Sequence, residues 1–276
     1  MTLPINFLYL GGDKCGSTWI HHILSQHKDV KLAHAKELFY FDRFYDKGPN
    51  WYLRQFPKAD ASKRMGEICH DYLYSERALH RIAADLPATA QFLITVRNPV
   101  SRTLSHYKYL LKIGRTKLSF AEALKAYPQL VDHSKFGKYV QLAQDILGHA
   151  RVHVLPFEQL AEDPVQFGRR ISRALDIEFD PNLSYADKIL QAQAARNPTL
   201  VRLLRNTGWV VRSIGAPRLV GAVKSSAAVH KLLFSSSKLK SKPSHVTPEL
   251  LSLLDSQFGA DQALLRACVP DLQFAA

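Results

Sequence analysis

Short apolar runs alternate with helical patterns along the chain, and this alternation predicts the fold. Three runs have the length and composition of β-strands, at residues 5–10, 92–96 and 151–155. After the first run, apolar residues recur at helical spacing from Ser17 onward. Strands that alternate with helices favour an α/β fold of three layers, in which a central parallel sheet is flanked by helices.

The segment between the first strand and the first helix has the form of an anion-binding loop. It runs from Gly11 to Gly16, and the helix follows at once. Backbone N–H groups and the positive end of a helix point at an anion in such a loop. The frame is P-loop-like, but Ser17 stands where a Mg²⁺-dependent nucleotide-binding enzyme has lysine, and Lys14 lies inside the loop instead. The loop therefore favours a grip on a nucleotide 5′-phosphate without a metal.

A second segment, residues 91–107, also reads as strand, turn and helix. Its strand ends at Arg97, Asn98 suits the helix N-cap, and Pro99 suits the first helical position. Ser105 is then expected about two turns into the helix. An arginine at a strand end offers a planar fork of donors that fits a second phosphate.

Together these segments resemble the sulfotransferases that use 3′-phosphoadenosine 5′-phosphosulfate (PAPS), in the heparan-sulfate-type and bacterial carbohydrate branch. Residues 14–19 are similar to the 5′-phosphosulfate loop of that family, and residues 97–105 to its 3′-phosphate motif. Residues 36–41 are similar to the segment that carries the catalytic glutamate. The resemblance covers nearly the whole chain in the right order. It implies transfer of the sulfuryl group from PAPS, as co-substrate, to a hydroxyl of a carbohydrate, glycolipid or specialised metabolite.

The resemblance also implies roles for single residues. Lys14 is expected to neutralise charge on the bridging oxygen, and Glu37 to act as the general base. Aromatic residues 39–41 are expected to desolvate Glu37 and raise its pKa; the alternative is an ion pair with a nearby lysine. His70 and His34 are reserve bases, because histidine titrates in the useful range. No metal site is expected, and the residues expected to bind PAPS are Lys14, Cys15, Gly16, Ser17, Thr18, Trp19, Arg97, Ser105, Lys240 and Lys242.

One segment departs from the family pattern. Residues 66–72 align with a family segment that usually reads Glu-Lys-Thr/Ser-Pro-x-Tyr, but Ile68 stands in place of the lysine and His70 in place of the proline. In heparan-type relatives that lysine lies near the active site. Either His70 or a lysine from the basic loop at 235–243 compensates, or the acceptor differs from a sulfated glycan. Arg102 is expected to support the helix or the edge of the site.

The net charge of +13 over 276 residues is unevenly placed. From Lys188 to Val246 there are eleven Lys or Arg and no Asp or Glu. Such a field attracts an anionic acceptor, a nucleotide or an acidic membrane surface, and the alternative is a solvated basic face. We expect one domain, residues 1–276, in which 196–246 form a basic variable or lid segment. Nucleic-acid binding is not expected, because no zinc-finger or RNA-recognition signature is present.

The cysteines of the chain bear on its cellular compartment, and two rival functions remain. Three widely spaced cysteines argue against a disulfide framework and favour the cytoplasm, and neither a signal peptide nor a membrane helix is expected. A P-loop nucleotide kinase is one rival; it predicts lysine after Gly16 and an acidic Mg²⁺ ligand at a later strand end, where Ser17 and Arg97 stand. The other rival is a non-catalytic basic protein that binds an anionic membrane or polymer.

Overall fold

Five parallel strands form the central sheet, in the order β2-β3-β1-β4-β5. The computed structural model describes residues 2–60, 63–187, 193–195, 234–238 and 246–272. The sheet confirms the predicted α/β fold. Strands β1, β4 and β5 lie where apolar runs predicted them, whereas β2 and β3 were missed because their short, partly polar sequences give no apolar run. The strands are β1 (Phe7–Gly11), β2 (Val30–Leu32), β3 (Arg64–Ile68), β4 (Gln91–Val96) and β5 (Val152–Pro156).

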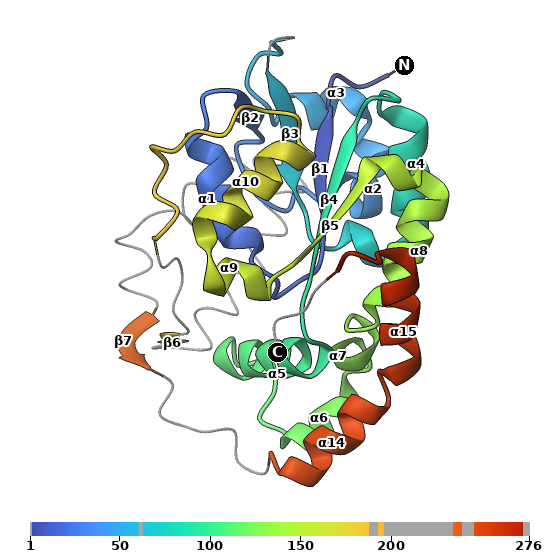
Figure 1. The fold of residues 1–276 in the computed structure, drawn as a ribbon, viewed down its shortest axis with the longest axis vertical. Coiled ribbons are helices and arrows are strands. Elements are labelled where there is room, and N and C mark those ends of the chain that lie inside the picture. Colours follow the sequence, from blue (N-terminus) through green and yellow to red (C-terminus); the bar gives the residue numbers. More distant parts are fainter. Residues whose placement is uncertain (1, 61–62, 188–192, 196–233, 239–245, 273–276) are drawn as a thin grey trace.

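Helices cover both faces of the sheet, which gives the three predicted layers (Figure 1). Side chains of β1 alternate between the faces: Phe7 and Tyr9 pack with α1 and α10, whereas Leu8 and Leu10 pack with α4 and α8. Both faces are therefore apolar, as expected for a parallel sheet buried between helices. The four covering helices are α1 (Ser17–Gln26), α4 (Glu76–Asp85), α8 (Phe136–Leu147) and α10 (Pro164–Ala174).

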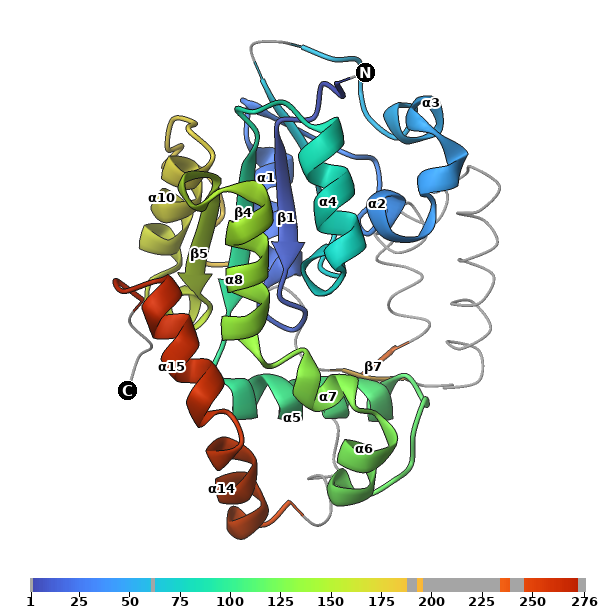
Figure 2. The same ribbon diagram turned by 90° about the vertical axis from the view of Figure 1, so that its right-hand side faces the viewer.

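A third cluster of apolar side chains lies beyond the carboxyl ends of the strands, around α5 (Pro99–Lys112) (Figure 2). The Asn98 side chain accepts a hydrogen bond from the Ser101 N–H at 2.9 Å, and Pro99 occupies the first turn, so the predicted helix start is confirmed. Helices α6, α7 and α14 pack with α5 in this cluster. Other helices are α2 (Tyr40–Arg43), α3 (Pro49–Leu53), α6 (Phe120–Ala126), α7 (Gln129–Asp132), α9 (Glu158–Glu162), α14 (Pro248–Ser256) and α15 (Gly259–Cys268), with 3₁₀ turns η1 (Tyr45–Lys47), η2 (Tyr72–Tyr74) and η3 (His149–Arg151).

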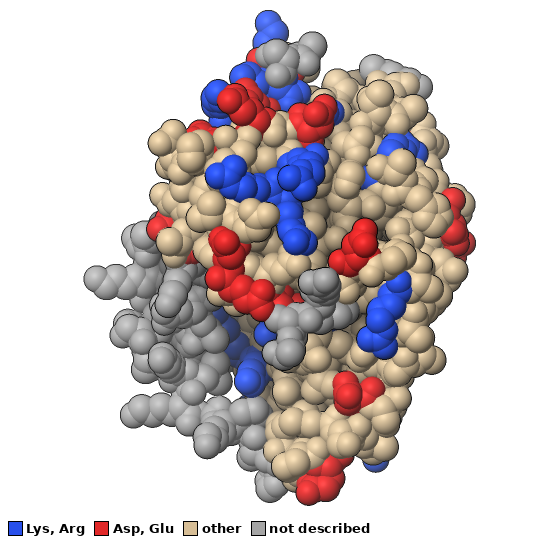
Figure 3. Space-filling view, in the orientation of Figure 1, with Lys and Arg blue, Asp and Glu red and all other residues tan. Residues whose placement is uncertain are grey.

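Most of the basic segment at 196–246, together with Lys240 and Lys242, lies outside the described residues. Within it, β7 (Phe234–Lys238) pairs antiparallel with β6 (Gln193–Ala195). The predictions of a lid and of a single domain stay predictions. On the face drawn in Figure 3, basic and acidic side chains of the described residues are interspersed. In the ranges that the structure describes, no helix is both long enough and apolar enough to span a membrane.

The backbones of α8 and α15 approach each other closely at Gly137. A Cβ atom there would lie 2.2 Å from the Asp261 carbonyl oxygen and 2.8 Å from the Leu265 nitrogen. We expect Gly137→Ala to lower the free energy of unfolding by about 1–3 kcal/mol, because the two helices must separate. Urea denaturation measures this change. Gly259→Ala is the control, since its Cβ would meet nothing within 4 Å; equal stability of the two variants would contradict the close packing.

Candidate functional site

The candidate site lies where β1 and β4 end side by side. These strands are neighbours in the sheet, and Gly11 at the end of β1 pairs with Ile94 of β4. The chain leaves β1 toward β2 and leaves β4 toward β5, so the direction of winding reverses between them. In open α/β sheets, ligands bind outside the carboxyl ends of the strands at such a point.

Buried hydrogen bonds fix the loop between β1 and α1 onto β4. The Gly12 N–H donates to the Thr95 carbonyl at 2.7 Å, and the Thr95 hydroxyl donates to the Cys15 carbonyl, also at 2.7 Å. On the other side, the Tyr9 hydroxyl donates to the Gly12 carbonyl at 2.9 Å. Both strands therefore hold the loop through hydrogen bonds within the protein.

The first turn of α1 is open to an anion. Its N-cap residue, Gly16, has a φ of 90° and supplies no side-chain hydrogen bond, and the first turn contains no acidic residue. Lys36 reaches this turn from the loop after β2: its Nζ lies 3.2 Å from Thr18 Oγ1 and 3.4 Å from Ser17 Oγ. The free N–H groups and the helix dipole favour negative charge here. Lys36 was not among the predicted site residues.

Two residues of this segment turn their side chains into the core. Cys15 is fully buried, and burial raises the pKa of its thiol. The Trp19 indole donates to the Tyr185 carbonyl at 3.2 Å and packs edge-on against Phe167, with ring centroids 5.7 Å apart. Cys15 and Trp19 were both predicted to bind PAPS. Because their side chains lie in the core, only their backbone N–H groups are available to a ligand.

The structure brings the two predicted phosphate grips together. Arg97 follows β4 directly, and its Nη1 donates to the Lys14 carbonyl at 3.2 Å. The Lys14 ammonium lies 4.5 Å from the centroid of the Tyr109 ring on α5. Burial lowers the pKa of Lys14, although the neighbouring Asp13 carboxylate opposes this decrease. Ser105 lies in the second turn of α5 and is half-buried.

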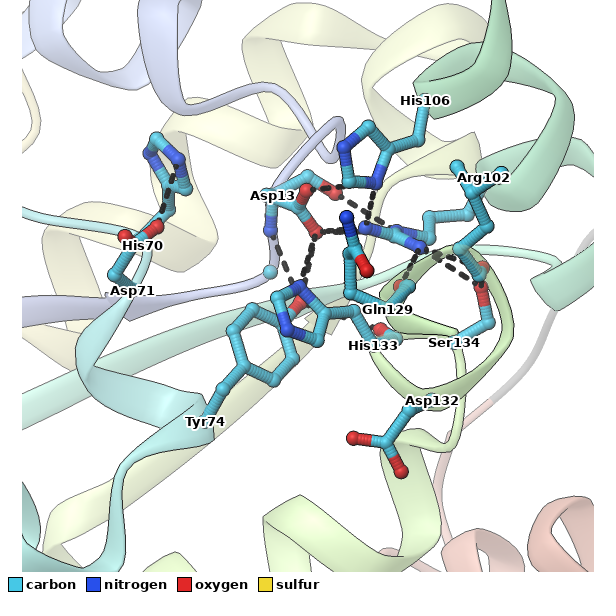
Figure 4. A network of polar contacts seen from close by, with 12 residues as sticks. Asp13, His70, Asp71, Tyr74, Arg102, His106, Gln129, Asp132, His133 and Ser134 are labelled. Atoms are coloured by element: carbon cyan, nitrogen blue, oxygen red, sulfur yellow. Dashed lines mark hydrogen bonds and ion pairs between the residues drawn. The ribbon is translucent and has the colours of Figure 1, made fainter. Parts of the chain in front are cut away.

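Asp13 is the centre of a buried polar network that joins the loop to α5 (Figure 4). The carboxylate pairs with Arg102, whose Nε lies 3.1 Å from Asp13 Oδ1 and whose side chain is fully buried. The Tyr74 hydroxyl donates to the same oxygen at 3.0 Å, and the His133 ring stacks on Tyr74 with centroids 3.8 Å apart. Arg102 thus joins α5 to the loop, but its partner Asp13 was not predicted. In the sequence, this pair is indicated only by the opposite charges of Asp13 in the loop and Arg102 in the helix.

Contacts within the network shift the pKa values of Asp13 and His106. Burial alone would raise the pKa of Asp13, but the Arg102 guanidinium and the neighbouring histidines hold it well below its usual value. Arg102 Nη2 lies 2.8 Å from His106 Nδ1. Because arginine can only donate, this nitrogen accepts, and the proton of the neutral ring is on Nε2. Burial lowers the pKa of His106 to about 3, and Arg102 adds to the decrease while Asp13 opposes it.

The two leading candidates for the base lie next to each other. His70 Nδ1 is 3.4 Å from Glu37 Oε1, and His70 Nε2 is 3.1 Å from Asp71 Oδ1. The contact with Glu37 has the geometry of an ion pair and not of a hydrogen bond. The Glu37 N–H donates to the Ile68 carbonyl at 3.0 Å, which fixes the turn to β3. His34, the other reserve base, is exposed.

Aromatic packing in this region encloses another carboxyl, Glu67 on β3. Tyr52 and Tyr72, which pack against residues 40–41, have their hydroxyls near Glu67. Glu67 is fully buried, and burial raises its pKa to about 7 although these hydroxyls favour the charged form. The Glu37 side chain, in contrast, keeps 20% of its surface exposed. Glu67 is therefore the carboxyl that the aromatic residues bury completely, whereas Glu37 is only partly buried.

A polar cavity of 440 Å³ lies at the opposite, amino end of the sheet. Its charged side chains are already paired: Lys63 Nζ lies 2.9 Å from Asp29 Oδ1, and Arg64 Nη2 lies 2.8 Å from Asp176 Oδ2. It contains none of the predicted site residues. In the part of the chain that the structure describes, no group of three or more His, Cys, Asp or Glu side chains is arranged to hold a metal ion.

Parts of the chain are similar in sequence to known sulfotransferases. Residues 71–181 match the model described as the sulfotransferase family. A stretch of 173 residues is 29% identical to human heparan sulfate glucosamine 3-O-sulfotransferase 3B1 and covers 59% of this chain and 44% of that protein. A stretch of 115 residues is 29% identical to membrane-associated sulfotransferase kil1 of Dictyostelium discoideum and covers 41% of this chain and 24% of that protein.

A solved structure shares the fold. A sulfotransferase from Alicyclobacillus acidocaldarius matches with a TM-score of 0.60 at 24% identity, over 82% of this chain and 96% of that one. The predicted P-loop-like three-layer fold is thereby confirmed. The chain spans less than half the length of either curated relative. The segment that matches the sulfotransferase family contains Arg97 and Ser105, whereas Lys14 and Glu37 precede it.

The buried pair of Asp13 and Arg102 gives a testable prediction. Asp13→Asn keeps the shape of the side chain but leaves the Arg102 charge buried without a counter-charge. We expect the free energy of unfolding to fall by about 3–5 kcal/mol at neutral pH. Chemical denaturation measures this loss. Asp176→Asn is the matched control, because that carboxylate pairs with Arg64 at the surface with 89% of its side chain exposed, and its loss should change stability much less. Similar losses in both variants would contradict the importance of the buried pair.

Proposed function

We propose that this protein is a PAPS-dependent sulfotransferase that transfers a sulfuryl group to a hydroxyl of a carbohydrate, glycolipid or specialised metabolite. The observation that carries the proposal is the junction of two phosphate grips at the ends of β1 and β4. One is the open first turn of α1 with Lys14, and the other is Arg97, which bonds to the Lys14 carbonyl. A nucleotide with phosphates on both its 3′ and 5′ positions suits a site with two such grips.

The residues of the loop fit the donor end of PAPS. N–H groups at the start of α1 and the hydroxyls of Ser17 and Thr18 would hold the 5′-phosphate, as helix N-termini hold other anions. Lys14 would neutralise the charge that develops on the oxygen between phosphorus and sulfur. Arg97 and Ser105 would hold the 3′-phosphate and so fix the nucleotide along α5. Part of this grip, Lys240 and Lys242, lies outside the described residues.

The acceptor side is proposed to operate through Glu37. The acceptor hydroxyl oxygen forms a bond to sulfur while the bond from sulfur to the 5′-phosphate oxygen breaks, and the hydroxyl proton passes to the Glu37 carboxylate. The products are a sulfate ester and adenosine 3′,5′-bisphosphate. His70 lies 3.4 Å from Glu37 and is the alternative proton acceptor. Because the two groups are adjacent, the substrate hydroxyl is expected in the same place with either base.

The proposed acceptor class follows from the relatives and from the charge. One relative is named as a heparan sulfate glucosamine sulfotransferase, which supports a sugar hydroxyl. The basic stretch between Lys188 and Val246 would attract an anionic acceptor or an acidic membrane surface. A cytoplasmic location remains part of the proposal, supported by Cys15, Cys69 and Cys268, which are all free thiols.

Donor and acceptor use can be tested directly. The wild-type protein should bind adenosine 3′,5′-bisphosphate in calorimetry and transfer ³⁵S from labelled PAPS to a member of a sugar and lipid acceptor panel, both in the presence of EDTA. A nucleotide kinase would instead bind ATP with Mg²⁺, and a non-catalytic anion binder would transfer no label. Absence of bisphosphate binding would overturn the proposed function.

Substitution of the proposed base, Glu37, tests the proton transfer. Glu37→Gln should lower turnover by about 10²–10⁴-fold, because the proton acceptor is removed while the shape is kept. Its affinity for adenosine 3′,5′-bisphosphate should stay at the wild-type value, since Glu37 is not placed against the phosphates.

The matched control for the base is Glu76→Gln, an exposed glutamate at the start of α4, and its turnover should remain at the wild-type rate. Activity of Glu37→Gln together with an inactive but folded His70→Ala would assign the base to the histidine instead.

A further inference from the structure

Lys36 occupies a position that the predicted roles do not explain. It precedes Glu37 in the turn after β2, yet its ammonium extends to the first turn of α1, 3.2 Å from Thr18 Oγ1 and 3.4 Å from Ser17 Oγ. The side chain is half-buried. These two hydroxyls are the ones proposed above to hold the 5′-phosphate of the donor.

The backbone holds this lysine in place. The Ala33 N–H donates to the Gly66 carbonyl at 3.0 Å, and the Glu37 N–H donates to the Ile68 carbonyl, also at 3.0 Å. Both ends of the segment that carries Lys36 are thus fixed to β3, which lies between β2 and β1 in the sheet. The ammonium is presented to α1 by a turn anchored in the core.

Several positively charged groups meet at the start of α1. The N-terminus of a helix carries partial positive charge, so an ammonium there is repelled. The pKa of His21, one turn further along α1, is lowered to about 4 by burial first and by the Lys36 charge second, although the Glu37 carboxylate opposes the decrease. Lys14 and Arg97 add positive charge on the loop side. The groups that meet at this helix end suit a ligand group with more than one negative charge.

We propose that Lys36 is a third cation of the donor site, which binds the 5′-phosphate of PAPS and stabilises it as the bond to sulfur breaks. The proposal rests on the proposed function. It also places the donor cation and the base on one turn, since Glu37 is the next residue. A single anchored segment would then align the leaving group with the acceptor hydroxyl.

A pair of nucleotides separates this role from a merely structural one. Adenosine 3′,5′-bisphosphate carries the 5′-phosphate, and adenosine 3′-monophosphate lacks it. In calorimetry, Lys36→Met should weaken binding of the bisphosphate by about 10- to 100-fold, the usual effect of a lost charge-assisted hydrogen bond. Binding of the 3′-monophosphate should not change. Lys36→Arg should recover most of the lost affinity because it keeps the charge.

Lys28 provides the control for this experiment. Lys28→Met removes an exposed lysine paired with Glu178 and should leave both affinities unchanged. If Lys36→Met weakens both nucleotides equally, or neither, Lys36 does not bind the 5′-phosphate, and the inference fails while the proposed function stands. If the wild-type protein binds neither nucleotide, the proposed function itself fails.

Discussion

The ion pair between Asp13 and Arg102 is the constraint on which the site depends. It connects the loop after β1 to the second phosphate motif on α5, and it does so with an arginine that is fully buried. A buried guanidinium is costly unless its donors are satisfied, and here the carboxylate, the Leu130 carbonyl at 2.9 Å and the Ser134 hydroxyl at 3.2 Å receive them. Contacts within the protein therefore hold the two halves of the candidate site together.

A second set of constraints comes from the middle of the sheet. Thr95 holds the loop from β4, and the backbone of β3 holds the turn that carries Lys36 and Glu37. Under that turn lies Glu67, buried among tyrosines with a pKa raised by burial to about 7. The loop and the residues proposed as donor cations and base are thus attached to three consecutive strands, β3, β1 and β4. Such attachment would give the preorganisation that the proposed transfer of a charged group requires.

Much of this arrangement could be predicted from sequence, because it is encoded locally. The apolar runs of β1, β4 and β5 and the cap at Asn98 are contiguous signals, and each predicted its element correctly. Contacts between distant segments gave no such signal. Asp13 is one polar residue in a loop until Arg102, 89 positions later, folds against it. Likewise, the contacts of Lys36 with Ser17 and Thr18 form only when the turn after β2 packs against α1.

The central claim is that one nucleotide occupies both phosphate grips at the ends of β1 and β4. A crystal structure of the full chain with adenosine 3′,5′-bisphosphate tests it most directly. The account predicts the 5′-phosphate at the first turn of α1, in contact with Lys14 and Lys36, and the 3′-phosphate in contact with Arg97 and Ser105. A nucleotide bound away from this edge of the sheet, or one whose 3′-phosphate does not touch Arg97, would contradict it.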